Sequence, residues 1–243
     1  MITQARRAGG QVLSWRMRHL LVLALAALLV WGFGTLRAEW SPMHRWNRAF
    51  GDASLLLVAT SMALGPLSRL WRRAARWLAW RRELGIWGFG AGLVHGGFIL
   101  FGWVALEWPR LFGFEFHPAL QRYVMFDKGF GIANIIGILA LLYALILSLT
   151  SNNFSQALMG QSVWKFLQRG AYVLWMLIVV HTAYFLYMHF LDFHRNVPEP
   201  NQLQLPFALL VAGVLALQAL ASWKTWRLSA GRNGAGKAAS GVG

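Results

Sequence analysis

Residues 84–106 read LGIWGFGAGLVHGGFILFGWVAL, an unbroken apolar stretch that contains one histidine, His95, and no charged side chain. About 20 apolar residues are enough to cross the roughly 30 Å hydrocarbon core of a bilayer. In lipid such a segment must be helical, because otherwise its backbone polar groups have no partners. The stretch therefore predicts a transmembrane helix with a single ionisable group near its middle.

Five further stretches of the 243-residue chain have the same character, and the whole chain is 57% hydrophobic with a mean hydropathy of +0.47. The six predicted spans are residues 19–36, 51–68, 84–106, 131–150, 167–190 and 204–226. The first lacks a small-residue cleavage site before Glu39, which favours an uncleaved anchor over a signal peptide. We therefore predict an all-α integral membrane protein, a six-transmembrane-helix bundle.

The formal net charge of +15 is distributed unevenly between the two sides of the membrane. With six spans, the termini share a side, and that side carries 16 of the 23 lysines and arginines. An excess of these residues marks the cytoplasmic face. We therefore predict that both termini are cytoplasmic. The basic balance then reflects topology and contact with membrane lipid, not nucleic acid.

The chain is predicted to form one transmembrane domain, residues 1–228, followed by a tail at 229–243. The tail reads SAGRNGAGKAASGVG and has no apolar side chains large enough to build a core, so we expect a disordered, Gly-rich cytoplasmic segment. Cysteine is absent, which excludes disulfides, thiolate metal sites and covalent haem attachment through CxxCH.

His95 and His181 are the candidate metal ligands. His95 lies 13 residues after Arg82 and His181 lies 12 residues after Arg169, so both rings are predicted about 18–20 Å from the inner boundary at 1.5 Å per residue. Both spans run in the same direction, so the histidines meet at one level. Intramembrane histidines are costly and usually functional, and imidazole is a common axial ligand of haem iron. The pair predicts one non-covalently held haem b.

A stripe of glycines shares a helix face with His95, formed by Gly85, Gly88, Gly92 and Gly96. Glycines beside a ligand leave room for a flat macrocycle, and on this basis Gly88 and Gly92 are candidate cofactor-binding residues. The same spacing is typical of two helices in close contact. The sequence leaves both interpretations open.

Several segments resemble the ferric reductase-like transmembrane family over about residues 50–190. The matching motifs are RRELGIWGF at 81–89 followed by His95, GPLSR at 65–69, LSLTS at 147–151, and then Trp164, Leu167, Tyr172 and His181. Within the family, the chain most closely resembles the haem-bearing membrane subunits of periplasmic methionine sulfoxide reductases (MsrQ, or YedZ). The resemblance implies six helices in a bacterial inner membrane, b-type haem, and electron transfer from the cytoplasmic side or the quinone pool to an outer acceptor.

The chain departs from the family pattern at Gln168, where a further histidine is common. The third span offers only Trp80, Arg81 or Arg82 at the matching level. An inner haem with two histidine ligands therefore cannot form, and the sequence predicts a single haem.

The sequence leaves the electron donor and acceptor open. A quinol or a separate flavin reductase is the expected donor, since this chain shows no flavin module, and quinone or FMN are further candidate cofactors. The outer loop, residues 107–130, is a candidate docking surface for a periplasmic oxidoreductase. On this interpretation the chain is the electron-transfer subunit of an oxidoreductase system. One alternative is a direct quinone or metal reductase. Another is a non-redox transporter or assembly factor whose histidines are structural or proton-linked.

Overall fold

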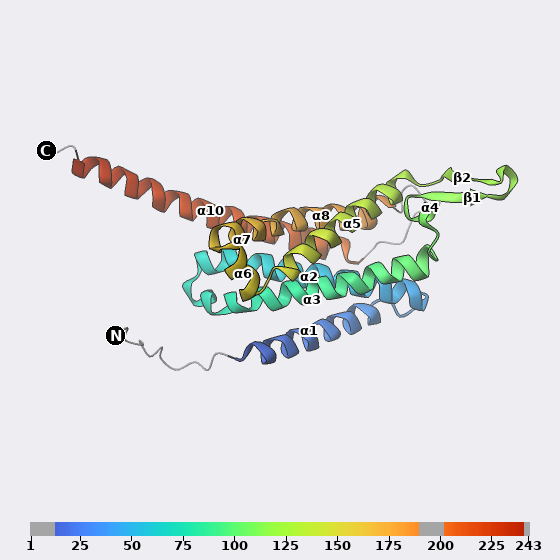
Figure 1. The fold of residues 1–243 in the computed structure, drawn as a ribbon, viewed down its shortest axis with the longest axis horizontal. Helices are drawn as coiled ribbons and strands as arrows, with labels where there is room; N and C mark the ends of the chain where they lie inside the picture. The colour runs from blue at the N-terminus through green and yellow to red at the C-terminus, as the bar shows by residue number, and fades with distance from the viewer. Residues whose placement is uncertain (1–12, 190–201, 241–243) are drawn as a thin grey trace.

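The computed structural model describes residues 13–189 and 202–240, the last ten by their backbone only. Six segments within this part are long and apolar enough to cross a membrane, which confirms the predicted six-helix integral membrane bundle. They lie roughly along one axis of an elongated molecule (Figure 1). The segments are Trp15–Thr35, Pro42–Leu70, Arg72–Trp103, Lys128–Leu149, Gln161–Met188 and Gln204–Ala230.

The two ends of the bundle differ in composition. The start of α1 (Trp15–Thr35), the 3₁₀ helix η1 (Arg72–Trp80) and the far end of α10 (Gln204–Ser240) lie at one end, which we call the basic end. The other end carries the hairpin of β1 (Phe114–His117) and β2 (Arg122–Met125) and is called the hairpin end. The first and last helices thus begin and finish at the same end, as an even number of spans requires. Assignment of the basic end to the cytoplasm remains a prediction.

Helix α2 (Pro42–Leu70) begins nine residues before the predicted start at residue 51, so that boundary was wrong. Pro42 occupies the first turn, where its missing N–H costs nothing. The added turns carry polar side chains that lowered the local hydropathy. Just after these turns, the carboxylate of Asp52 is satisfied within the bundle, because Arg37 donates a hydrogen bond to it over 2.6 Å.

Helix α3 (Arg81–Gly97) continues as a π-helix, η2 (Phe98–Trp103), and the helical path ends there. The predicted span reached residue 106. However, Ala105 and Leu106 have positive φ angles of 49° and 62°, which cannot belong to a right-handed helix. The wider turn of a π-helix changes which side chains face inward, and such turns are frequent at functional sites.

The fifth predicted span is two helices with a break between them. Helix α7 (Gln161–Gln168) is followed by α8 (Ala171–Ala183) and by a second π-helix, η4 (Tyr184–Met188). The short α6 (Asn153–Met159) precedes α7 and returns the chain from α5 (Lys128–Leu149). The predicted end of this span at residue 190 lies outside the described residues.

The segment between η2 and α5 is the exception to the all-helical pattern. It contains α4 (Trp108–Leu111), β1 (Phe114–His117), the 3₁₀ turn η3 (Pro118–Leu120) and β2 (Arg122–Met125). The two strands pair antiparallel, with Phe114 opposite Met125, and the hairpin extends beyond the helices (Figure 1). It occupies the loop that was predicted as a docking surface.

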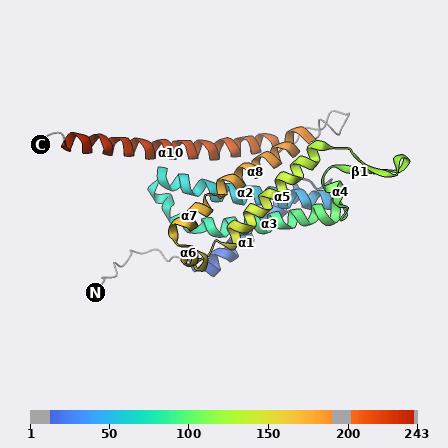
Figure 2. The ribbon, with the colours of Figure 1, turned by 45° about the horizontal axis from the view of Figure 1, so that its top comes forward.

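Helix α2 lies at the centre of the bundle, against α1, α3, α8 and α10. Figure 2 shows α10 running along the same side as α2 and continuing beyond it. The backbone of α10 is helical through Ser240, further than the predicted span end at residue 226 and into the segment expected to be disordered. A helix satisfies its own backbone hydrogen bonds, so it can extend without a core. The domain boundary at residue 228 remains a prediction.

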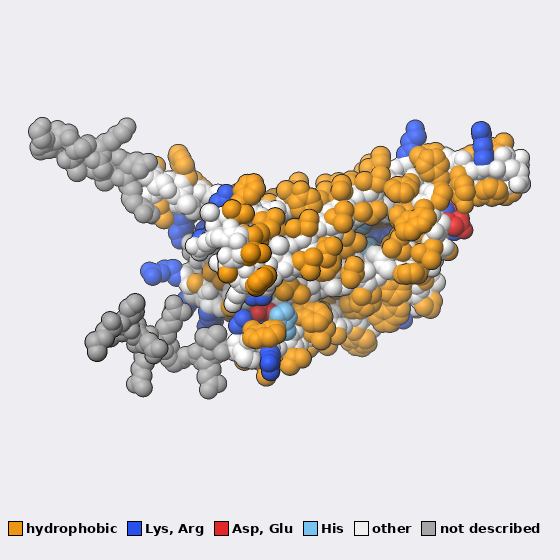
Figure 3. All heavy atoms as spheres, viewed as in Figure 1, with side chains coloured by type: hydrophobic (Ala, Val, Ile, Leu, Met, Phe, Trp, Pro, Cys, Tyr) orange, Lys and Arg blue, Asp and Glu red, His pale blue; other side chains and the backbone are white. Residues whose placement is uncertain are grey.

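The core consists of small clusters of buried apolar side chains between helices, and the outer surface is also apolar. Leu55, Val58 and Met62 of α2 pack with Trp175 of α8, which is 1% exposed. Figure 3 shows hydrophobic side chains covering the visible length of the bundle, with basic residues gathered near its ends. A surface of this kind fits a lipid environment.

Candidate functional site

His95 is held by backbone groups of the neighbouring helix. Its Nδ1 lies 2.9 Å from the carbonyl oxygen of Asn47 on α2. One turn further along α2, Gly51 faces the ring, and a Cβ built there would lie 3.2 Å from Nδ1. A side chain at residue 51 would therefore push against the imidazole.

His181 is held in the same way by a different helix. Its Nδ1 lies 2.8 Å from the carbonyl oxygen of Ala133 on α5. Gly137, one turn further along α5, lies against the ring, and a Cβ there would be 2.8 Å from Cε1. The approach is closer than at Gly51 and leaves no room for a methyl group.

These hydrogen bonds fix the protonation pattern of both neutral rings. A carbonyl oxygen only accepts, so each Nδ1 must carry the proton and donate it. The lone pair then lies on Nε2, and neither Nε2 atom makes a hydrogen bond to another described residue. Histidines that bind a metal through one ring nitrogen usually donate a hydrogen bond from the other nitrogen, and this bond orients the ring.

The two imidazoles lie side by side, as their equal predicted depth required. Their ring centres are 6.2 Å apart and their planes are inclined by 83°. Two imidazoles that bind one ion from opposite sides, with metal–nitrogen bonds of about 2.0–2.1 Å, have ring centres about 6 Å apart. Each ring can rotate about its own metal–nitrogen bond, so perpendicular planes are compatible with such a pair.

A spacing of 86 residues relates the two halves of the site, a repeat that the sequence analysis missed. The acceptor carbonyl, the glycine, the histidine and the first residue of the following π-helix all obey it. The pairs are Asn47 and Ala133, Gly51 and Gly137, His95 and His181, and Phe98 and Tyr184. The helix pairs α2–α3 and α5–α8 therefore present their histidines by one structural device.

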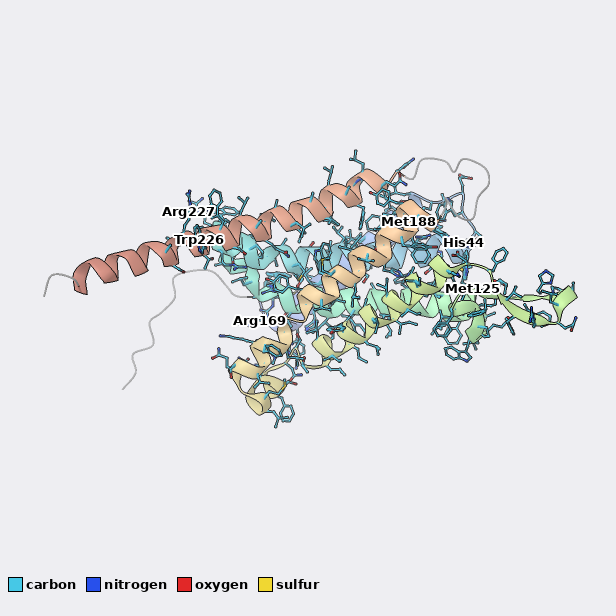
Figure 4. The ribbon with its side chains drawn as sticks, turned by 90° about the horizontal axis from the view of Figure 1, so that it is seen from above. His44, Met125, Arg169, Met188, Trp226 and Arg227 are labelled. Carbon is cyan, nitrogen blue, oxygen red and sulfur yellow. The ribbon has the colours of Figure 1, made fainter. Side chains whose placement is uncertain are left out.

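Both histidines line a cavity of about 1710 Å³ between these helix pairs. Pockets for small molecules typically measure about 300–1,000 Å³, so this one has room for a large planar group. The cavity runs from His44 at the hairpin end to Arg169 at the basic end, and Figure 4 labels both residues near opposite ends of the bundle. Most of its wall between these ends is apolar.

The glycine stripe of α3 serves two contacts. Gly88 lines the cavity but also touches α2, where a Cβ would lie 2.9 Å from Val58 Cγ2, and Ser54 Oγ donates to the Gly88 carbonyl over 2.8 Å. Gly92 lies between Ser54 and Leu141 of α5 and also lines the cavity. Close helix contact is thus observed at Gly88, and cofactor binding by Gly88 and Gly92 remains a prediction.

At the basic end of the cavity, the level where an inner ligand pair would lie carries no histidine. Gln168 donates to Thr150 Oγ1 over 3.1 Å, and Arg81 donates from Nε to the Ser61 carbonyl over 3.1 Å. These side chains are engaged with their neighbours. Among the described residues, His95 and His181 are the imidazole pair brought together in the cavity, and the single haem inferred from Gln168 stays a prediction.

Two other histidines line the hairpin end of the cavity. His44 Nδ1 lies 2.7 Å from Ser41 Oγ, and the ring packs edge-on against Trp103 at 4.6 Å. His189 Nδ1 lies 3.7 Å from Asp127 Oδ2, an ion pair when the histidine is protonated. Among the described residues, no group of three or more His, Cys, Asp or Glu side chains could hold a metal ion. Two imidazoles alone suit a metal whose other ligands come from a macrocycle.

The fold and the cavity define a multi-pass membrane protein with an internal site between two helix pairs. Residues 50–179, over half of the chain, match the family described as ferric reductase like transmembrane component, and the chain belongs to this family. His95 lies within the matched segment and His181 two residues beyond it. The family consists of membrane electron-transfer components and generally binds haem, a group that the imidazole pair and the cavity fit.

Proposed function

We propose that the protein is a membrane b-type cytochrome in which His95 and His181 are the two axial ligands of a single haem b. The spacing of 6.2 Å between the two rings is the observation that carries the proposal. The carbonyls of Asn47 and Ala133 support it, because they orient both rings and leave each Nε2 for a metal.

Haem, when bound, supplies reversible one-electron transfer. His95 and His181 would together hold the iron and would leave no coordination position for oxygen or substrate, which suits electron transfer better than catalysis at the metal. The chain's own work is to position the group. Gly51 and Gly137 let the rings approach α2 and α5, Gly88 and Gly92 leave the α3 wall flat, and the apolar cavity wall excludes water.

The direction of transfer follows from the two ends of the bundle. We propose that the basic end faces the cytoplasm of a bacterium, as the positive-inside rule indicates. A quinol, or a flavin reductase with FMN, would deliver electrons there, and a periplasmic oxidoreductase at the hairpin end would accept them. This is the role of the MsrQ-like proteins that the sequence resembles.

An optical spectrum of the purified, dithionite-reduced protein tests the proposal. We expect the sharp absorption of a b-type cytochrome, a haem content of one per chain, and loss of the signal in both His95→Ala and His181→Ala. His117→Ala is the matched control, because His117 lies on the exposed hairpin. An edge-to-face pair of aromatic rings that binds no metal has similar spacing. A colourless, stable preparation from haem-replete cells would indicate such a structural pair and would contradict the proposal.

A further inference from the structure

Arg48 is a cation on the cavity wall whose role the two histidines do not explain. It follows Asn47, whose carbonyl holds His95, and it lines the cavity. Its guanidinium lies 5.2 Å from the centre of the Phe185 ring, and it is close enough to interact electrostatically with both His95 and His181. It makes no hydrogen bond or ion pair with any residue that the structure describes.

The carboxylate on α2 with which Arg48 interacts is already occupied. Asp52, one turn along α2, accepts a hydrogen bond from Arg37 over 2.6 Å, and both side chains of that pair are largely buried. Arg48 also interacts electrostatically with Asp52. Two guanidinium groups thus share one carboxylate, which leaves one positive charge without a counter-charge among the residues that the structure describes. Inside a membrane protein an unbalanced charge is costly, and such charges mark functional contacts.

The equivalent position in the other half of the site carries a neutral side chain. Asn134 lies 86 residues after Arg48, and it also lines the cavity. Its amide donates to the carbonyl of Leu111 over 2.9 Å, so its polar group is satisfied within the protein. Of these two equivalent positions, the one on α2 therefore presents a cation beside the imidazole pair, and the one on α5 presents a neutral, hydrogen-bonded amide.

We propose that Arg48 binds a propionate carboxylate of the haem that His95 and His181 hold, and so fixes the orientation of the macrocycle. This inference rests on the proposed function. A guanidinium forms two parallel hydrogen bonds to a carboxylate, an arrangement that a lysine ammonium cannot reproduce. Phe185 holds the guanidinium by its ring face and leaves its edge available. A haem carboxylate at this place supplies the missing negative charge.

The test compares iron protoporphyrin IX with its dimethyl ester, in which both propionates are neutral. The full-length haem-free protein in detergent is titrated with each compound and followed by absorbance. We expect the wild type to bind the free acid about tenfold to a hundredfold more tightly than the ester, the range of a hydrogen bond to a charged group. In Arg48→Gln the preference falls to less than about threefold, and Arg48→Lys retains part of it.

Arg45→Gln is the matched control. Arg45 lies on the same helix with its guanidinium 4.9 Å from the centre of the Trp46 ring, and it is absent from the described side chains that line the cavity. It should keep the wild-type preference. Equal ester binding by wild type and Arg48→Gln shows that the variant folds. An unchanged acid preference in Arg48→Gln, or no preference in the wild type, overturns the role of Arg48 alone. Failure of the wild type to bind either compound overturns the proposed function as well.

Discussion

The helix pairs α2–α3 and α5–α8 hold one histidine each through the same contacts, yet they offer different side chains to the cavity between them. Where α3 has Gly88 and Gly92, the positions 86 residues later on α8 are Leu174 and Ile178, which also line the cavity. One wall is therefore flat and the other is filled. The contacts shared by both halves position the imidazoles, and the differences determine where a planar group has space.

Of the two glycines that face the imidazoles, Gly137 makes the closer contact, and its replacement should have the largest effect on haem binding. In Gly137→Ala the new Cβ would lie 2.8 Å from His181 Cε1 and 2.9 Å from Nδ1, so the ring must move away from the Ala133 carbonyl. We expect haem affinity to fall about tenfold to a hundredfold, the cost of overpacking a fixed site. Haem titration of the purified protein measures it.

Gly97→Ala is the control for that variant, because Gly97 is also helical and a Cβ there would have no atom within 4 Å. It should bind haem like the wild type. If Gly137→Ala binds haem with wild-type affinity and an unchanged low-temperature electron paramagnetic resonance spectrum, the position of the His181 ring does not depend on a glycine at residue 137.

The flat wall of α3 gives the second prediction. In Gly88→Ala the Cβ would lie 2.9 Å from Val58 Cγ2, and a valine methyl cannot rotate away freely. We expect a loss of about 1–2 kcal/mol in the free energy of unfolding, because α2 and α3 must separate slightly. Denaturation of the haem-free protein in mixed micelles provides the measurement.

Gly85→Ala lies on the same stripe and has no atom within 4 Å of its Cβ, so it serves as the partner variant. It should be as stable as the wild type or slightly more so, since alanine favours the helix. Equal stability of the two variants would mean that Gly88 serves the cofactor alone and not the contact with α2.

Asn134 gives a smaller effect, on stability and not on haem. Asn134→Ala removes the hydrogen bond to the Leu111 carbonyl and leaves that buried acceptor without its partner. We expect a cost of about 1 kcal/mol in the free energy of unfolding. The preference for haem over its dimethyl ester should stay at the wild-type value, unlike that of Arg48→Gln. A lost preference in Asn134→Ala would show that both halves contact the carboxylates.

Hydropathy predicted the six spans, because it depends on the side chains alone. It failed where polar groups enter a helix. Asn47 and Arg48 lower the hydropathy of the first turns of α2, although the side chain of Asn47 is buried inside the protein. It also began the fifth span at residue 167, near the end of α7, because the polar side chains of α7 make that helix less apolar than α8.

The hydrogen-bond partners of the two histidines could not be predicted from the sequence, for a different reason. Nδ1 of each ring donates to a backbone carbonyl, and any residue type supplies a carbonyl, so Asn47 and Ala133 left no side-chain signal. The recurrence of a glycine and a histidine 86 residues apart was present in the chain, but weak without the pairing of the helices. Arg48 was counted among the outer basic residues, because its position relative to Asp52 and the cavity depends on the longer α2.

Replacement of Gly51, the glycine that faces the His95 ring, has the smallest predicted effect and allows a direct comparison with Gly137. In Gly51→Ala the Cβ would lie 3.2 Å from His95 Nδ1 and 3.3 Å from Cε1, contacts that a shift of a few tenths of an ångström relieves. We expect haem affinity to fall by about two- to fivefold, under 1 kcal/mol. Gly51→Ala and Gly137→Ala should therefore rank in the order of their contact distances when titrated with haem side by side. A larger loss in Gly51→Ala would mean that α2 is the more rigid wall, and that the site depends more on the half that carries Arg48.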